Sequence, residues 1–168
     1  GGLFRTVGLP FCQVTAGVSE VGTSKLVLWS PFHHVARPCE RGTRDRPCFN
    51  CFKCFRKMLI DRTLRGEVLS DSWLDQAFTI REARHALVQV PVKSECVVAY
   101  ITRRYSGKHG LMNALKEKVR GYMETDWLER WYGRSIDLIP EKYRRTVRKN
   151  ILTWLAEMGR ADVSCLTS

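Results

Sequence analysis

The stretch CERGTRDRPCFNCFKC, residues 39–54, holds four of the seven cysteines of this 168-residue chain. Their spacing is Cys39-x8-Cys48-x2-Cys51-x2-Cys54. Cysteines two residues apart can turn a tight loop around one ion, and four thiolates suit the tetrahedral coordination of Zn²⁺. The sequence therefore predicts a zinc site with these four cysteines as its ligands.

The segment between Cys39 and Cys48 is polar and contains Gly42 and Pro47, so it can fold back and bring Cys39 into the site. Four thiolates on Zn²⁺ leave a negative site, which nearby basic residues would offset. These are Arg37, Arg41, Arg46, Lys53 and Arg56. A site with four protein ligands is closed, which indicates a structural rather than a catalytic ion.

Three alternatives to a zinc ion held by these four cysteines stay open. Three thiolates at this spacing also suit an iron–sulfur cluster. The cysteines could instead be ordinary buried side chains without a metal. His33 or His34 could replace one ligand, although four cysteines already suffice.

The chain is strongly basic, with 28 Lys and Arg against 17 Asp and Glu and a formal net charge of +11. Such an excess favours polyanionic partners, nucleic acid or nucleotide phosphates among them, and a solvated basic face is the alternative. One basic run could touch a nucleic-acid backbone or form a solvated loop. It comprises Arg103, Arg104, Lys108 and His109 around Tyr105.

No apolar run approaches the ~20 residues that cross a bilayer, so no membrane partner is expected. Cysteines clustered at two-residue gaps, rather than spread along the chain in pairs, indicate a metal site in a reducing compartment. The expected localisation is therefore cytoplasmic.

Two regions are predicted, 1–69 with mixed elements and 70–168 with helices and short loops. In the first, Phe11–Val14 suits a strand, Ser19 can cap a helix that ends near Pro31, and another helix runs from Cys51 to a cap at Gly66.

In the second region, Ser70 or Ser72 can cap a helix, and Thr79 with Glu82 makes a capping box. Ser94 begins a segment that suits a helix or a strand. The longest predicted helix runs from Pro140 to Gly159. One apolar stripe along it should face the core. The stripe comprises Tyr143, Val147, Ile151, Trp154, Leu155 and Met158.

The segment from Gly17 to Lys25 nearly spells a phosphate-binding loop. Two glycines have the right separation, but the lysine that should follow Gly22 comes two places late. A helix start with Ser24 and Lys25 nearby could still hold a phosphate. A simple helix cap is the other interpretation.

The cysteine segment resembles the zinc site of 7-cyano-7-deazaguanine synthases, a branch of the N-type ATP pyrophosphatase superfamily. That family has the same four-cysteine spacing, often followed by a basic stretch, here Phe55-Arg56-Lys57. The resemblance covers roughly residues 5–60. The superfamily's Ser-Gly-Gly-x-Asp-Ser loop is absent, and the chain begins without Met, so we expect the C-terminal part of a longer, divergent enzyme.

The resemblance implies a fold, an activity and partners. Residues 1–69 would be the end of a Rossmann-like nucleotide-binding α/β domain with a zinc knuckle, and 70–168 a helical region. The whole enzyme would adenylate a carboxylate with ATP and Mg²⁺ and convert it to an amide or nitrile. Lys25 and Ser24 would assist the phosphates, and this chain alone would be inactive.

Implied partners are a nucleotide or deazapurine-like small molecule and a second copy of the chain in a homodimer. Whether the chain is an enzyme is left open, since the ATP-binding loop lies outside it. The alternative function is a zinc-stabilised basic helical module that binds RNA or DNA through its basic surface.

Overall fold

The computed structural model describes residues 13–36, 39, 41–43, 46–120 and 124–166. Within these ranges every regular element is a helix. Strand pairing is limited to isolated bridges of Trp131 with Val18 and with Glu157. The expected Rossmann-like α/β part is therefore wrong for the described residues.

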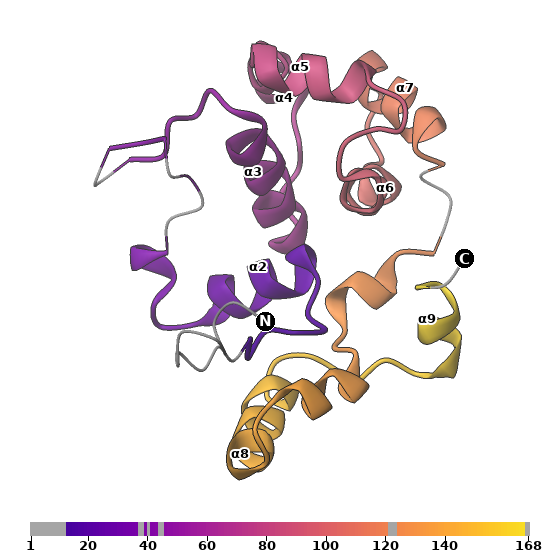
Figure 1. Cartoon of the computed structure of the whole chain (residues 1–168). Helices are drawn as coiled ribbons and strands as arrows, with labels where there is room; N and C mark the ends of the chain where they lie inside the picture. Colours follow the sequence, from indigo (N-terminus) through magenta and orange to yellow (C-terminus); the bar gives the residue numbers. More distant parts are fainter. Residues whose placement is uncertain (1–12, 37–38, 40, 44–45, 121–123, 167–168) are drawn as a thin grey trace.

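The eight α-helices and three 3-10 helices follow in chain order (Figure 1). They are α2 (Glu20–Trp29), η1 (His33–Val35), α3 (Phe52–Leu64), α4 (Asp71–Ala77), α5 (Arg81–Val88), α6 (Glu95–Arg104), α7 (Gly110–Lys118), η2 (Asp126–Glu129), η3 (Gly133–Leu138), α8 (Glu141–Leu152) and α9 (Arg160–Ser164). No helix in the described ranges is long and apolar enough to span a bilayer.

The strand expectation fails for a local reason. Phe11 lies outside the described residues, and Val14 lies in a turn that the amide of Ala16 closes by donating to the carbonyl of Gln13 at 3.0 Å. The segment after Ser94, which suited either element, is helix α6. Val97, Val98 and Ile101 belong to an unbroken run of six buried residues, 97–102, so α6 is enclosed by the core instead of packing on it with one face.

Three predicted helix ends are confirmed. The Ser19 hydroxyl accepts the amide of Gly22 at 3.0 Å at the start of α2, and Ser70 accepts the amide of Trp73 at 3.4 Å at the start of α4. Gly66 follows α3 with φ +67°, a left-handed conformation that glycine adopts at little cost.

The predicted capping box of Thr79 and Glu82 is wrong. The Thr79 hydroxyl donates to the carbonyl of Gln76 at 2.7 Å, so it closes the end of α4 instead of opening α5. Helix α5 begins after Ile80, without a side-chain cap.

One apolar core contains buried residues from each of the α-helices α2 through α7 and from η2. Helices α3 and α6 pack against each other, and α7 packs on α6 (Figure 1). The largest buried side chains of this core are Tyr100, Phe55, Ile60, Leu74 and Met112. Residues on both sides of position 69 contribute to it, and the division of the chain at that position stays a prediction.

A second, smaller cluster lies where α8 meets η3. It consists of Trp131, Ile151 and Leu155, with Val147 packed against it. The predicted helix to Gly159 ends early, at Leu152, because the amides of Trp154 and Leu155 both donate to the carbonyl of Ile151. This turn buries Leu155 and leaves Trp154 46% exposed, and Tyr143 is 49% exposed. Burial of the whole stripe is therefore wrong for these two aromatic residues.

A half-buried carboxylate, Glu129, connects three elements. Its Oε1 accepts the Tyr100 hydroxyl of α6 at 2.8 Å and the Arg104 guanidinium at 3.0 Å, and its Oε2 accepts Lys25 Nζ of α2 at 2.9 Å. Burial alone would raise the pKa of Glu129. The hydrogen bonds from Lys25 and Tyr100 and the charge of Arg104 outweigh it, so the pKa lies below its ordinary value of 4.5.

We expect Glu129→Gln to lower the free energy of unfolding by about 2 kcal/mol at neutral pH. This is less than the roughly 3–5 kcal/mol of a fully buried pair, since a quarter of the Glu129 side chain is exposed. A lowered folded-state pKa stabilises the protein at pH values above the unfolded-state pKa. This stabilisation is lost as the pH falls through the folded-state pKa. Denaturant titrations should show the difference between wild type and variant shrinking below about pH 4.5.

The matched control is Glu117→Gln, because Glu117 is an exposed acid on α7 with no side-chain partner among the described residues. It should change the stability by less than about 0.5 kcal/mol. If Glu129→Gln lowered the free energy of unfolding by the same amount at every pH from 7 to 3, this result would contradict the role of the Glu129 charge.

Candidate metal centre

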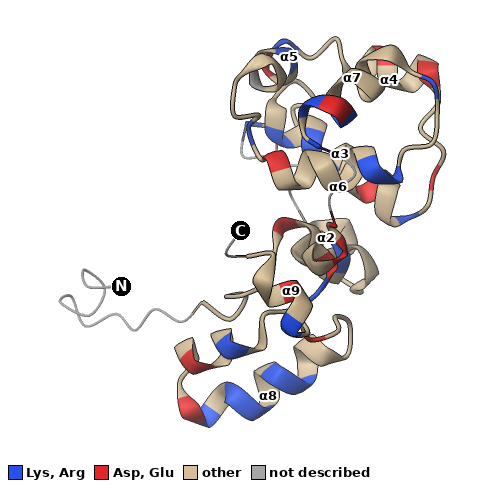
Figure 2. Ribbon diagram, turned by 90° about the vertical axis from the view of Figure 1, so that its right-hand side faces the viewer, with Lys and Arg blue, Asp and Glu red and all other residues tan. Residues whose placement is uncertain are grey.

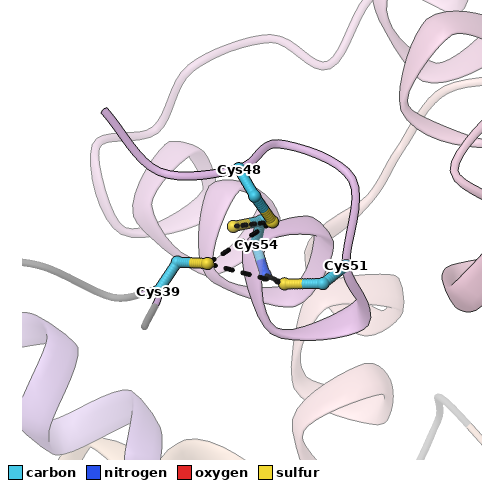
Figure 3. Close-up of side chains that lie close together, drawn as sticks. All are labelled: Cys39, Cys48, Cys51 and Cys54. Atoms are coloured by element: carbon cyan, nitrogen blue, oxygen red, sulfur yellow. Dashed lines mark hydrogen bonds between the residues drawn. The ribbon is translucent and has the colours of Figure 1, made fainter. Parts of the chain in front are cut away.

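The four predicted cysteines meet at the start of α3 (Figure 3). Their sulfur atoms all lie within 4.8 Å of one another. The Cys39–Cys48, Cys39–Cys51 and Cys48–Cys54 sulfur pairs are 3.4, 3.9 and 3.7 Å apart. The thiols are free, and Zn–S bonds of about 2.3 Å place the sulfurs of a tetrahedron roughly 3.8 Å apart. The cluster can therefore hold a metal ion.

Helix α3 and the turn before it position three of the ligands. Cys51 is the N-cap residue of α3, and its sulfur accepts the amide of Cys54 at 3.4 Å. Phe49 has φ +50°, which lets the turn fold back so that the Cys48 sulfur accepts the amide of Asn50. A non-glycine residue in this region stores strain, which is common where the surroundings fix a functional geometry.

The site is closed and continuous with the core. Cys54 is 1% exposed, and Cys39 and Cys51 are buried too. On the same turn, Phe52 and Phe55 face the main core, and the Phe55 ring lies 5.4 Å from that of Phe78. The first turn of α3 thus has two buried faces, one of sulfur and one of aromatic carbon.

The fourth ligand comes from a loop that has little spare room. A Cβ placed on Gly42 would lie 2.1 Å from the carbonyl oxygen of Arg46, so only glycine allows the two arms of the loop to approach this closely. Arg41 forms an ion pair with Glu82 of α5, which ties this loop to the helical core.

Neighbouring groups shift the pKa values of the thiols in different directions. The amide of Cys48 lowers the pKa of the Cys39 thiol to about 6. Burial raises the pKa of the Cys54 thiol. Glu82 raises the pKa of Arg41 most strongly, and the thiolates of Cys51 and Cys48 raise it further. The ion-pair partner of Arg41 is Glu82, and charge compensation of the sulfurs by Arg41 stays a prediction.

The other cations expected near the sulfurs have different positions. Arg56 binds Glu20 at 2.9 Å and the Ser94 hydroxyl at 2.6 Å, away from the cysteines. Arg46 and Lys53 are exposed, and Arg37 lies outside the described residues.

A scan against protein-family models matches residues 1–168 to a family of unknown function, DUF6395. The chain belongs to DUF6395. No curated protein and no solved structure matches it. This family has no assigned activity, and the match does not connect the chain with the 7-cyano-7-deazaguanine synthases. The four-cysteine cluster is the part of that resemblance that the structure of this DUF6395 chain confirms.

The two predicted phosphate-binding residues point to different partners. Lys25 pairs with Glu129, whereas the buried Ser24 hydroxyl donates to the carbonyl of Glu20 at 2.8 Å and accepts from Lys57. The start of α2 is a helix cap, since Ser19 occupies the amide of Gly22. Nucleotide binding by Ser24 and Lys25 stays a prediction.

The predicted basic run 103–109 is largely neutralised. Arg103 binds Glu124 at 3.0 Å, and Arg104 binds both Asp126 and Glu129. His109 is buried, with its Nε2 3.1 Å from an oxygen of Asp75. His33 and His34 are exposed and do not belong to the metal-binding group.

The structure also shows a pocket of about 320 Å³ between α2 and α3, which the sequence reading missed. One wall carries Lys53, Lys57, Asp61 and Arg65, and Ser24 lies on the other. The sequence signal for this wall was the i, i+4 spacing of its four residues, because residues at that spacing share one helix face.

We expect Gly42→Ala to weaken metal binding at least about tenfold, the effect of about 1.4 kcal/mol on an equilibrium constant. The added Cβ would push the loop of Cys39 away from Arg46 and separate this sulfur from the other three. Competition with a chromophoric chelator measures the affinity. Gly110→Ala is the control, because a Cβ there meets no atom within 4 Å. Equal affinities for both variants would show that the close approach at Gly42 does not matter.

Proposed function

We propose that this chain is a zinc-stabilised helical module, in which Cys39, Cys48, Cys51 and Cys54 hold one structural Zn²⁺. The observation that carries the proposal is the convergence of four sulfurs, within 4.8 Å, on the buried first turn of α3.

Sulfur separations of 3.4 to 3.9 Å suit a single ion better than a cluster of several irons and sulfides, which needs more room between its ligands. A lone iron would fit equally well, and metal analysis separates the two. Four protein ligands leave no open coordination position, so the ion would organise the chain and take no part in a reaction.

The ion would act on the fold through α3. It would join the loop that carries Cys39 to the first turn of α3, and that turn also supplies Phe52 and Phe55 to the core. Because no preformed site exists in an unfolded chain, the free energy of metal binding contributes directly to folding.

The proposal is confined to metal binding. The ligase activity expected from the resemblance depended on a nucleotide-binding α/β domain, and the described residues form helices instead. A nucleotide or deazapurine-like ligand and a homodimer stay predictions.

The protein as purified should contain one zinc per chain by mass spectrometry of its metals, and Cys54→Ser should abolish this. Cys54 is the most buried ligand, so its loss leaves an incomplete and open site. Cys96→Ser, which changes an exposed cysteine of α6, should keep the full zinc content.

Removal of the ion should lower the free energy of unfolding by about 4 kcal/mol relative to protein at a free zinc concentration a thousandfold above Kd. Stoichiometric iron with visible colour would refute zinc as the bound metal. A metal-free chain as stable as the loaded one would refute its structural role.

A further inference from the structure

Helix α8 is strongly basic. This helix carries five basic residues and one acidic residue over Glu141–Leu152. Figure 2 shows it as a largely blue rod at the opposite end of the molecule from α4, α5 and α7. Whereas Arg103 and Arg104 pair with acids, the charge on α8 is only partly compensated.

Two of the five cations serve the fold. Arg144 donates to the carbonyls of Ile139 and Asp137 at 2.8 and 3.1 Å. Arg148 binds Glu157 at 2.7 Å. Both therefore hold the ends of α8 against the segments before and after it.

The other three cations, Lys142, Arg145 and Lys149, are exposed and have no ion-pair partner in the described part of the chain. Viewed along the axis of α8, with 100° per residue, the three cations fall within about 60° of one another. They lie opposite Val147 and Ile151, which face the apolar cluster. They span seven residues, about 10 Å along the axis. One strand of a nucleic-acid duplex presents about three phosphates over that length.

One exposed aromatic ring of α8 lies beside a cation of this face, and a second follows the helix. Tyr143 is 49% exposed, and its ring centroid is 4.8 Å from Lys142 Nζ. Trp154, 46% exposed, follows the C-terminal end of α8. Cations that track a phosphate backbone beside rings on which bases stack are the usual surface for single-stranded nucleic acid.

A lipid surface fits α8 less well. A helix that lies on a membrane must bury an apolar face among the lipids. The apolar side of α8 already packs on Trp131 and Leu155 through Val147 and Ile151. Among the exposed residues of α8, only Tyr143 and Leu152 are aromatic or apolar.

We propose that the outward face of α8, made by Lys142, Arg145 and Lys149 with Tyr143 and Trp154 at its border, binds single-stranded nucleic acid through phosphates and stacked bases. This proposal is independent of the zinc ion, since no residue of the α8 face contributes to the cysteine site.

The test measures fluorescence anisotropy of the zinc-loaded full chain with a labelled single-stranded RNA of about 20 nucleotides. The triple variant K142Q/R145Q/K149Q should bind at least about tenfold more weakly, and the slope of log K against log salt should become shallower by about 2. The matched control is R81Q/K108Q/R120Q. It removes three exposed cations that also lack an ion-pair partner in the described ranges, and it should bind within about twofold of wild type.

The aromatic residues give a second, independent readout. Y143A/W154A should weaken binding about tenfold while leaving the salt slope unchanged, because stacking does not release counterions. Circular dichroism and zinc content should match wild type for all three variants, since the substituted side chains are exposed.

Several results would overturn the proposal. Equal losses in the two triple variants would mean that only net charge matters. Duplex DNA or polyglutamate bound as tightly as the single strand would indicate a different partner. Absence of binding at about 50 mM salt would remove nucleic acid as a partner altogether.

Discussion

The closure of the loop from Cys39 onto the first turn of α3 is the constraint on which the rest of this structure depends. Without it, the polar segment before α3 would be linked to the helical core by the exposed ion pair of Arg41 with Glu82. With it, the cysteines and two phenylalanines fix one helical turn from both sides. Helix α3 can then pack against α2, α5 and α6 and form the centre of the main core.

The same arrangement separates the molecule into functional parts. The sulfur cluster is closed, so the ion that we propose there would organise the chain and would not contact a ligand. The pocket between α2 and α3 is lined by cations, carboxylates, hydroxyls and apolar side chains. At the far end, α8 presents a face whose charges the fold leaves unused (Figure 2). The Glu129 network connects η2, which precedes that end, with α2 and α6.

The resemblance to an α/β enzyme was informative at four residues and wrong for the fold of the described residues. Cysteine spacing reports on coordination geometry, which unrelated chains can share, because a tetrahedral ion demands the same turn in any fold. The secondary structure around the site follows different rules. Here the caps at Ser19 and Ser70 begin helices, and the apolar run of α6, which suited a strand as well, is a helix buried in the core of the described ranges.

The sequence by itself determined the four-cysteine cluster, three of the helix ends and the excess of positive charge, because each depends on residue type and short spacing. Only the tertiary structure decided which charges are paired. Arg103 and Arg104 are neutralised by acids more than twenty positions away, whereas Lys142, Arg145 and Lys149 meet no acid among the residues that the structure describes. Long-range pairing of this kind leaves no trace in local spacing. The early end of α8 also depends on tertiary packing, since burying Leu155 against Trp131 turns Trp154 towards solvent.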